Sequence, residues 1–319
     1  MDSVAGLLDG PRAREAFLLR SVLDPPWAIR IQDEAPLSLV TVVRGAAWVL
    51  LEAGDEVRLG PGDVAVLRGP QPYTVADEPS TAPQVVIHPG QRCTTTDGAT
   101  PYQLTGFGIR TWGNHPEGET VLLTGTYQSD REISRRLLAA LPELIVLDAD
   151  TLRNPLTGYL AAELIRDEPG QAAVLDRLLD LLLVAVLRAW FARPEAAAPG
   201  WYVAHSDPIV GPALRLLQGD PARPWTVAEL AAATSSSRAG FARRFKELIG
   251  EPPMTFLTNW RLTLAADLLC EPGATVGSVA RQVGYSSPFA FSTAFKRVRG
   301  VSPASLRSAG RPPARGEVR

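Results

Sequence analysis

The sequence predicts an α+β protein of several domains, in which a sheet-rich N-terminal part and further helices precede an all-α C-terminal domain. Three observations lead to this fold class. Short β-branched runs between residues 37 and 88 are separated by turn signals, a helical period replaces them from residue 131, and a helix-turn-helix unit occurs twice between residues 226 and 306. A chain of 319 residues is long enough for two or three such domains.

Charge is unevenly distributed along the chain. The whole sequence has 32 basic and 34 acidic residues, a formal net charge of −2. From residue 205 to the end, 15 Lys and Arg stand against 8 Asp and Glu, a net charge of +7, whereas the first 204 residues hold 17 against 26, a net charge of −9. An acidic front and a basic back indicate different partners for the two halves.

Several broad classes of protein find no support in the sequence. The N-terminus lacks the basic and apolar regions of a signal peptide, and the longest apolar run, Leu178–Phe191, is interrupted by charges, so no membrane association is expected. Cys93 and Cys270 are the only cysteines, which excludes a disulfide framework and predicts a reducing cytoplasm, with Cys270 in the core. Neither a nucleophile elbow nor a P-loop occurs.

The front half has the pattern of a small sandwich or barrel. Gly-containing turns separate closely spaced short runs of apolar and β-branched residues. The expected strands are Leu37–Val43, Trp48–Leu51, Val57–Leu59, Val64–Leu67 and Val85–His88, with a further pair near Phe107–Thr111 and Val121–Tyr127.

Three helices are expected between residues 131 and 192. The first lies in Arg131–Leu147 and ends at Pro142, and the second lies between Pro155 and Pro169. The third, Gln171–Ala192, is apolar on most of its surface, so it is either a core helix of its own domain or a helix of a dimer interface. Both interpretations remain open at this point.

The back half contains two copies of one unit, about fifty residues apart. Their matching residues are Thr226 and Thr275, Ala231 and Ala280, Ser237 and Ser287, Phe241 and Phe291, Phe245 and Phe295, Gly250 and Gly300, and Pro253 and Pro303. Such regular self-similarity indicates two modules of the same structure.

Each copy has the local signals of a helix-turn-helix. Thr226 is expected to cap a short first helix, and Glu229 completes a capping box. Gly284 supplies the positive φ of the second turn, where the first copy has Ser235 instead. The paired phenylalanines of each second helix stand four residues apart and face the core, which leaves the opposite face exposed.

The exposed faces of the two second helices are the predicted DNA-binding surface. Lys and Arg neutralise phosphates, and Arg also reads guanine in the major groove. The candidate contacts are Arg238, Ala239, Ala242, Arg243 and Lys246 in the first copy, and Phe289, Ala290, Thr293, Lys296 and Arg297 in the second. The apolar helix Thr255–Cys270 between the copies would fix the distance between them.

The segment Val279–Arg307, "VARQVGYSSPFAFSTAFKRVRGVSPASLR", closely resembles the second helix-turn-helix of the AraC/XylS family of bacterial transcription regulators. The resemblance extends over residues 207–307 and implies a domain with two such units joined by a long helix. It also implies base contacts from Ala239, Ala242 and Arg243 and from Phe289, Ala290 and Thr293. Because alanine and phenylalanine side chains form no hydrogen bonds to bases, either contacts with thymine methyl groups or positioning on the DNA backbone is expected at those positions.

The front half resembles the cupin-type effector domain of one AraC subgroup, in segments such as "RLGPGDVAVLRGPQPYTV" and "VIHPGQRCTTTDG". Metal-binding cupins carry an H-x-H pair, which is missing here, and the chain has only three histidines. We therefore expect no metal, no other cofactor and no catalytic residue.

The resemblance and the patterns together define five expected segments. They are a cupin-like, effector-sensing β domain at 1–130, a helical dimerisation segment at 131–192, a linker at 193–206, an AraC-type DNA-binding domain at 207–307 and a disordered tail at 308–319.

Two kinds of effector site are conceivable in the β domain. Cys93 lies in a predicted loop beside His88 and Arg92, which would lower the pKa of its thiol and make it a redox sensor; otherwise it is a structural thiol. Alternatively, His88 and His115 line a small-molecule pocket with Trp48, Tyr73 and Trp112; otherwise these residues are packed in or beside the barrel.

The sequence thus predicts a cytoplasmic, homodimeric transcription regulator, an activator, that binds double-stranded promoter DNA and contacts RNA polymerase. A small-molecule or redox effector would favour one arrangement of its DNA-binding domains. Two alternatives are a metal-dependent cupin enzyme fused to a DNA-targeting module, and a module whose helix-turn-helix units contact only protein.

Overall fold

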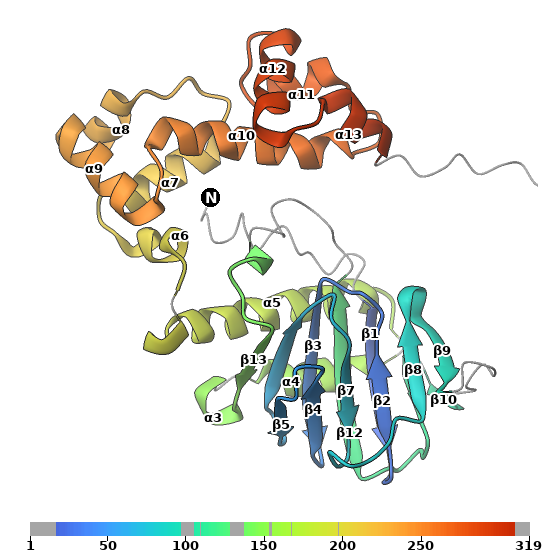
Figure 1. The fold of residues 1–319 in the computed structure, drawn as a ribbon. Helices are drawn as coiled ribbons and strands as arrows, with labels where there is room; N and C mark the ends of the chain where they lie inside the picture. Colours follow the sequence, from blue (N-terminus) through green and yellow to red (C-terminus); the bar gives the residue numbers. More distant parts are fainter. Residues whose placement is uncertain are drawn as a thin grey trace, which may run out of the picture. The chain divides into compact units, whose positions relative to one another are not determined.

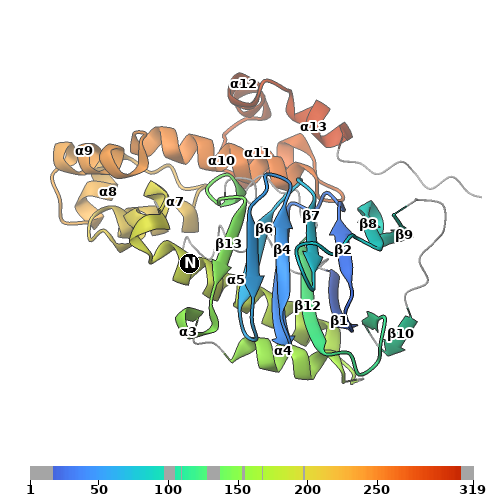
Figure 2. The same ribbon diagram turned by 60° about the horizontal axis from the view of Figure 1, so that its bottom comes forward.

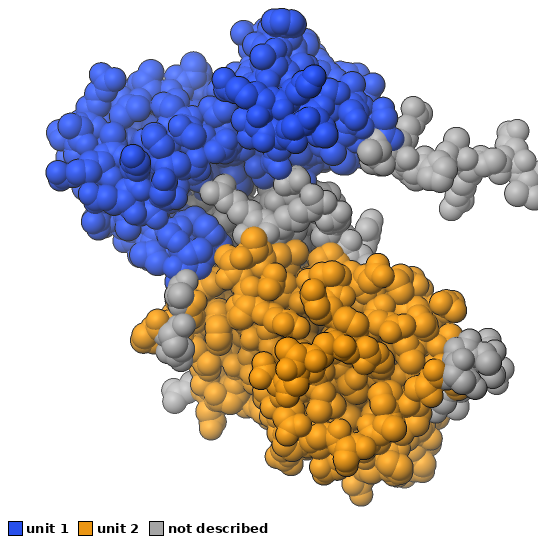
Figure 3. Space-filling model, in the orientation of Figure 1, with its two compact units in different colours: residues 1–10, 131–136, 198–319 blue, residues 11–130, 137–197 orange. Residues whose placement is uncertain are grey.

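The computed structural model describes residues 17–96, 105–108, 110–127, 137–152, 155–166, 168–196 and 198–309. They form two compact units, which Figure 3 shows in orange and blue. The described residues of the N-terminal unit lie within 17–127 and 137–196, and those of the C-terminal unit lie within 198–309.

The N-terminal unit is a sandwich of two β-sheets (Figure 1). In the described residues, one sheet has seven strands in the order β10 (Thr105–Gly108), β11 (Thr111–Gly113), β1 (Phe17–Leu23), β12 (Thr120–Tyr127), β3 (Leu37–Arg44), β6 (Val64–Arg68) and β13 (Leu144–Leu147). The other has six, in the order β5 (Glu56–Leu59), β4 (Ala47–Leu51), β7 (Tyr73–Ala76), β2 (Ala28–Ile31), β8 (Val85–His88) and β9 (Arg92–Thr95).

The inner faces of both sheets form one apolar core. Because side chains alternate along a strand, Val40 and Val42 of β3 point into this core together with Leu122 of β12. Ile29 of β2 and Val75 of β7 meet them from the six-stranded sheet. This is the sandwich that the turn-punctuated apolar runs predict.

Helices α4 (Leu156–Leu164) and α5 (Gln171–Phe191) cover the outer face of the seven-stranded sheet (Figure 2). Gly125 of β12 allows α5 to approach closely, since a Cβ there would lie 2.7 Å from Leu179 Cδ1. The Tyr127 hydroxyl, also on β12, donates a hydrogen bond to the Leu179 carbonyl oxygen at 3.1 Å. Helix α5 is therefore packed directly on strand β12 of the sandwich.

The segment 131–192 differs in part from the helical dimerisation segment that the sequence predicts. Residues 131–136 lie outside the described part, and Leu144–Leu147 form strand β13, which pairs with β6. A short helix, α3 (Ala149–Leu152), precedes α4. The described residues from 137 to 192 belong to the N-terminal unit, and α5 is a core helix whose Val174 and Leu181 are nevertheless exposed.

The C-terminal unit is entirely helical in its described residues. Its α-helices are α6 (Gly200–Val203), α7 (Val210–Gly219), α8 (Val227–Ala233), α9 (Arg238–Ile249), α10 (Pro253–Leu269), α11 (Val276–Gln282), α12 (Pro288–Arg299) and α13 (Pro303–Ala309). A 3₁₀ turn, η4 (Ala204–Ser206), joins α6 to α7. Helices α8–α9 and α11–α12 are the two helix-turn-helix pairs, and α10 runs between them (Figure 1).

The ends of this unit differ from the predicted linker and tail. Of the predicted linker 193–206, residues 194–196 form a 3₁₀ turn, η3 (Pro194–Ala196), whereas 200–206 form α6 and η4 of the C-terminal unit. Helix α6 packs on α9, where Gly200 leaves room for the Leu248 carbonyl group. Helix α13 continues to Ala309, and the remaining tail residues lie outside the described part.

Helix α10 contributes to two apolar cores. Its first half packs Phe256 and Trp260 against the phenylalanines of α9. Its second half packs Leu262 and Leu269 against the phenylalanines of α12. One continuous helix therefore belongs to both helix-turn-helix pairs, so neither pair can rotate freely about it.

Candidate nucleic-acid interface and effector cavity

The first helix-turn-helix is defined by caps at both of its helices. Glu229 N–H donates to Thr226 Oγ1 at 3.2 Å, and Thr226 N–H donates to Glu229 Oε2 at 2.8 Å, which is the predicted capping box. Ser235 has a φ of 52° in the turn, so this serine adopts the left-handed conformation for which the second copy uses glycine. Ser237 caps α9 by accepting a hydrogen bond from Gly240 N–H at 3.1 Å.

The second helix-turn-helix repeats this geometry. Gly284 has a φ of 84°, Ser287 caps α12 by accepting from Ala290 N–H at 3.1 Å, and Pro288 occupies the first helical turn. Thr275 also forms a capping box, with Ser278 in the role of the glutamate. Sequence reasoning missed this box because serine is not the usual residue at the third helical position.

Two phenylalanines fasten each second helix to the unit. The rings of Phe241 and Phe245 are 5.7 Å apart, and those of Phe291 and Phe295 are 5.5 Å apart, with all four side chains fully buried. Spacing of four residues places each pair on one side of its helix. The opposite faces of α9 and α12 are thereby turned to solvent.

The outer face of α9 is basic. Of the predicted contacts, Arg238, Ala239, Arg243 and Lys246 are exposed and Ala242 is half-buried. Arg243 forms a 3.8 Å ion pair with Glu247 one turn along, but at 80% side-chain exposure such a pair contributes little and can be exchanged for another anion.

The outer face of α12 is both basic and aromatic. Phe289 is 82% exposed, which is unusual for a phenylalanine and places an apolar ring at the N-terminal end of the helix. Ala290, Thr293, Lys296 and Arg297 are exposed on the same helix. The structure therefore brings together on each second helix the side chains that the sequence predicts, without by itself assigning them a role.

Other basic residues hold the unit together instead. Arg244 donates to Asp207 Oδ2 from both Nε and Nη2, at 3.0 and 2.8 Å, and so ties α9 to the start of α7. Burial alone would raise the pKa of Asp207, but hydrogen bonds from Val210 N–H, Arg244 and Ile209 N–H hold it below its ordinary value. Arg244 is thus engaged away from the outer face of α9.

Arg261 of α10 joins the two helix-turn-helix pairs. It donates to the carbonyl oxygens of Pro221 at 2.6 Å and Arg223 at 2.8 Å, in the loop before α8. The same loop packs on the turn of the second pair, where a Cβ on Gly284 would lie 2.7 Å from Ala222 Cα. These contacts fix the two pairs relative to each other, and the sequence analysis did not single out this arginine.

Of the predicted effector residues in the N-terminal unit, Tyr73 and Trp112 line the same cavity. Both contribute to a cavity of about 30 Å³ between the sheets, together with Ile29, Asp33 and Leu122. Trp48 is half-buried on β4, and it does not border the cavities described here. Tyr73 and Trp112 are therefore the two predicted effector residues that this cavity brings together.

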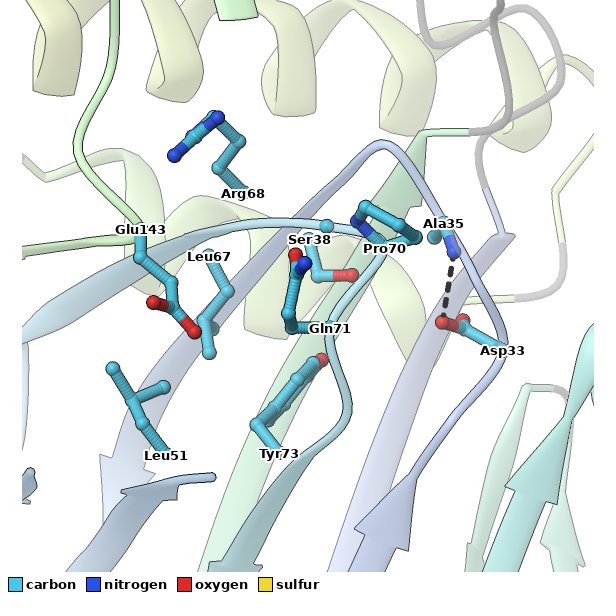
Figure 4. Close-up of a pocket in the computed structure, with 11 residues that line it drawn as sticks. Asp33, Ala35, Ser38, Leu51, Leu67, Arg68, Pro70, Gln71, Tyr73 and Glu143 are labelled. Atoms are coloured by element: carbon cyan, nitrogen blue, oxygen red, sulfur yellow. Dashed lines mark hydrogen bonds between the residues drawn. The ribbon is translucent and has the colours of Figure 1, made fainter. Parts of the chain in front are cut away.

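Figure 4 shows a small polar cavity beyond the end of β2, where the Tyr73 ring points toward Ser38 and Gln71. Burial raises the pKa of the Tyr73 phenol, with Ser38 opposing and Asp33 adding to the shift, and its hydroxyl has no hydrogen bond of ordinary geometry. Burial also raises the pKa of Asp33, whose carboxylate accepts from Ala35 N–H at 3.1 Å. With a volume of about 10 Å³, this cavity is about the size of one water molecule.

Comparison with known proteins identifies both parts of the chain. A family model described as cupin matches residues 2–192, and one described as a helix-turn-helix domain matches residues 230–309. A protein of Streptomyces lividans named as an AraC-like transcription regulator is 33% identical over 96% of this chain and 98% of its own length. The chain belongs to the AraC family of transcription regulators.

Two further similarities concern parts of this regulator. The RCS-specific HTH-type transcriptional activator RclR of Escherichia coli K12 is 28% identical over 61% of the chain and 70% of its own length. The DNA-binding domain of AdpA, crystallised in complex with a target DNA, is 35% identical over 33% of the chain and 93% of that domain, with a TM-score of 0.30.

Cys93 of the regulator differs from the reactive thiol that the sequence analysis considers. It lies on strand β9 opposite Ile87 rather than in a loop, and burial raises the pKa of its thiol. Both ring nitrogens of His88 are engaged, with Gln32 Nε2 at 3.1 Å and with Thr94 Oγ1 at 2.9 Å. The expected lowering of the Cys93 pKa by His88 and Arg92 is therefore wrong. Cys270, expected in the core, is exposed at the end of α10.

The described residues contain no cluster of three or more His, Cys, Asp and Glu side chains with the spacing of a metal site. Within the same residues, no helix has both the length and the apolar character needed to cross a bilayer.

Proposed function

We propose that the regulator binds promoter DNA with α9 and α12 in successive major grooves and activates transcription in response to an effector held by its N-terminal unit. The observation that carries this proposal is the duplicated geometry of the C-terminal unit. Two helices with equivalent caps and equivalent buried phenylalanines expose basic faces and share α10 as a rigid connection. Two helices that enter major grooves one DNA turn apart must be separated by about 34 Å.

Phosphate contacts are proposed for the charged residues without a local partner. Arg238 and Lys246 of α9 and Lys296 and Arg297 of α12 are exposed, and in the described structure no acidic side chain forms an ion pair with any of them. Cations left unpaired on one helix face are available to displace counterions from a duplex.

Base contacts are proposed for the remaining residues of the two faces. The guanidinium group of Arg243 can donate two hydrogen bonds to guanine, because the one ion pair that it forms within the described residues, with Glu247, is exposed and can be exchanged. Ala239, Ala242 and Ala290 allow close approach to thymine methyl groups, Phe289 offers a larger apolar contact, and Thr293 offers a hydroxyl and a methyl group.

We also propose a homodimer formed through α5. Val174 and Leu181 are 44% and 52% exposed on this helix, whereas seven of its apolar side chains are buried in the N-terminal unit, namely Leu175, Leu179, Leu182, Leu183, Val186, Leu187 and Phe191. Effector binding would then shift the population of two arrangements of the paired DNA-binding units. The activator name of RclR supports activation, which implies contact with RNA polymerase in the cytoplasm.

Selection of binding sites from random duplex DNA tests the function directly. The full chain should enrich one motif, and its affinity for that motif should fall steeply with salt, because several phosphate contacts release counterions. Absence of salt-dependent duplex binding would favour the alternative in which the helix-turn-helix pairs contact protein.

The enzyme alternative is less well supported, because the relatives are named transcription regulators. It predicts a tightly bound metal in the purified protein, which elemental analysis would detect.

A further inference from the structure

The outer faces of α9 and α12 differ in chemistry at equivalent positions. The buried Phe241 of α9 matches the buried Phe291 of α12. Residues two before and two after these phenylalanines lie about 200° around the helix from them, on the outer face. At these two positions α9 has Ala239 and Arg243, and α12 has Phe289 and Thr293.

The cations of α12 are confined to its C-terminal turns. The N-terminal residues of a recognition helix contact base edges, and in α9 this part includes Arg238 and Arg243. Residues 288–293 of α12 include no charged side chain and no amide, and Lys296 and Arg297 follow later. Helix α12 therefore offers no Arg, Lys, Asn or Gln for paired hydrogen bonds to one base in the part nearest the bases.

The ring of Phe289 determines what this part of α12 can recognise. It is 82% exposed, and the exposed Ala290 adjoins it. Against guanine or cytosine, an apolar ring would cover hydrogen-bonding groups without replacing their bonds to water, which costs affinity. A phosphate would lose hydration in the same way. Thymine presents an apolar group in the major groove, its C5 methyl, so the ring fits a base methyl and not the DNA backbone.

The same methyl group occurs on a second base. 5-Methylcytosine has its methyl on the same ring carbon as thymine, whereas its amino group differs from the oxygen of thymine. Because a phenyl ring forms no hydrogen bond to either group, the methyl is the feature that Phe289 can distinguish. Burial of one methyl group raises affinity about fourfold.

We propose that α12 recognises a C5-methyl group through Phe289, while α9 recognises guanine through Arg243, so that the binding site is asymmetric and 5-methylcytosine can take the place of thymine in the α12 segment. The proposal rests on the DNA-binding function stated above. It names the chemistry of each segment and decides between methyl contact and backbone positioning for Phe289.

The test uses the full chain and the duplex that it enriches from random DNA. Each thymine is replaced in turn by deoxyuridine, which lacks the methyl and keeps the base pair, and affinity is measured by fluorescence anisotropy at constant salt. One thymine should show a loss of about fourfold that falls below about twofold in Phe289→Ala. Phe289→Leu, which keeps an apolar side chain, should retain most of the preference. Because the ring is exposed, neither variant removes a core contact.

A second comparison isolates the methyl from the rest of the base. At the same position, 5-methyldeoxycytidine and deoxycytidine are each paired with guanine, so the methyl group is their sole difference. The methylated duplex should bind about fourfold more tightly to the unchanged chain, and this preference should disappear in Phe289→Ala.

The guanine assigned to α9 is located independently. 7-Deazaguanine lacks the N7 acceptor, so its effect on affinity should disappear in Arg243→Ala and persist in Phe289→Ala. The two bases identified should lie about ten base pairs apart, one DNA turn. A separation of only a few base pairs would overturn the assignment of one base type to each helix.

Val298 provides a matched control on the same helix. It is 44% exposed and lies seven residues after Phe291, on the side of the buried phenylalanines. Val298→Ala should keep the preference for thymine over deoxyuridine, and loss of the preference there as well would contradict a contact specific to Phe289.

Equal affinity for thymine and deoxyuridine at every position would overturn the proposal, as would a preference that persists in Phe289→Ala. A methylated duplex that binds no more tightly than its cytosine counterpart would also overturn it. The two claims fail separately: enrichment of no motif removes the DNA-binding function itself, whereas salt-dependent binding to one motif without methyl preference removes only this inference.

Discussion

Replacing Gly284 with alanine perturbs the contact that fixes the two helix-turn-helix pairs relative to each other. Gly284 has a φ of 84° and lies against the loop before α8, so the substitution adds backbone strain and a steric overlap at once. Gly300 is a matched control. Its φ is 75°, but nothing lies within 4 Å of the position that its Cβ would take.

The expected magnitudes follow from these two environments. An L-residue in the left-handed region costs about 1 kcal/mol, which is the whole effect expected for Gly300→Ala. At Gly284 the new Cβ would lie 2.7 Å from Ala222 Cα, about 1 Å inside the optimal carbon–carbon separation. The loop must move, which weakens the hydrogen bonds that Arg261 donates to it. Charge-assisted hydrogen bonds contribute about 2 kcal/mol, so Gly284→Ala should cost about 3 kcal/mol in total.

Hydrogen exchange of α11 and α12 in the full chain measures this cost locally, without assuming that the whole protein unfolds in one step. The opening free energy of these helices should fall by about 3 kcal/mol in Gly284→Ala and by about 1 kcal/mol in Gly300→Ala. Equal losses in the two variants would refute the role assigned to the loop contact, because strain from a positive φ alone would then explain both.

Three other substitutions test separate parts of the structure. Ser235→Gly should stabilise α8 and α9 against hydrogen exchange by up to about 1 kcal/mol, because it removes a positive-φ side chain that is exposed; a loss would contradict this. Arg243→Ala should weaken duplex binding by about 1–3 kcal/mol in fluorescence anisotropy. Arg215 is exposed on α7, and Arg215→Ala should leave duplex binding unchanged. Equal losses of affinity in the two variants would contradict the base contact assigned to Arg243. Asp207→Asn should cost about 2 kcal/mol of unfolding free energy at neutral pH, because the Arg244 bonds stabilise the carboxylate. Folding lowers the pKa of Asp207, so its carboxylate stabilises the folded state above the unfolded pKa near 3.8, and this stabilisation is lost as pH falls through the folded pKa. If the unchanged chain and Asp207→Asn still differed in unfolding free energy in acid, this role of the carboxylate would be contradicted.

The repeat was predictable because its constraints are local. Each of its signals depends on residues within about one helical turn of one another. These signals are a capping threonine, a positive-φ turn residue, a capping serine and two phenylalanines four residues apart. The predicted strand Val85–His88 also has the bounds found in the structure, since turn residues mark both of its ends.

Features that depend on distant pairing were not predictable. Leu144–Leu147 is a short apolar run that fits a helix or a strand equally well, and only pairing with β6 decides it. The cavity of about 30 Å³ between the sheets exists because β2, β7 and β11 bring positions 29, 73 and 112 together. Cys270 has the spacing of the apolar stripe of α10, but the helix ends at Leu269 and leaves the cysteine exposed.

The central claim is that α9 and α12 bind one duplex at a separation fixed by α10. Helix α10 has 17 residues and is therefore about 25 Å long, with little capacity to stretch. The most direct test measures the affinity of the full chain for its selected duplex after five or ten base pairs are inserted between the two contacted segments. We predict that both insertions reduce the affinity to that for a duplex with only one contacted segment. Five base pairs rotate the second segment to the opposite face of the duplex, and ten base pairs move it one DNA turn farther along the same face. Full affinity with either insertion would contradict a rigid connection between the two helices.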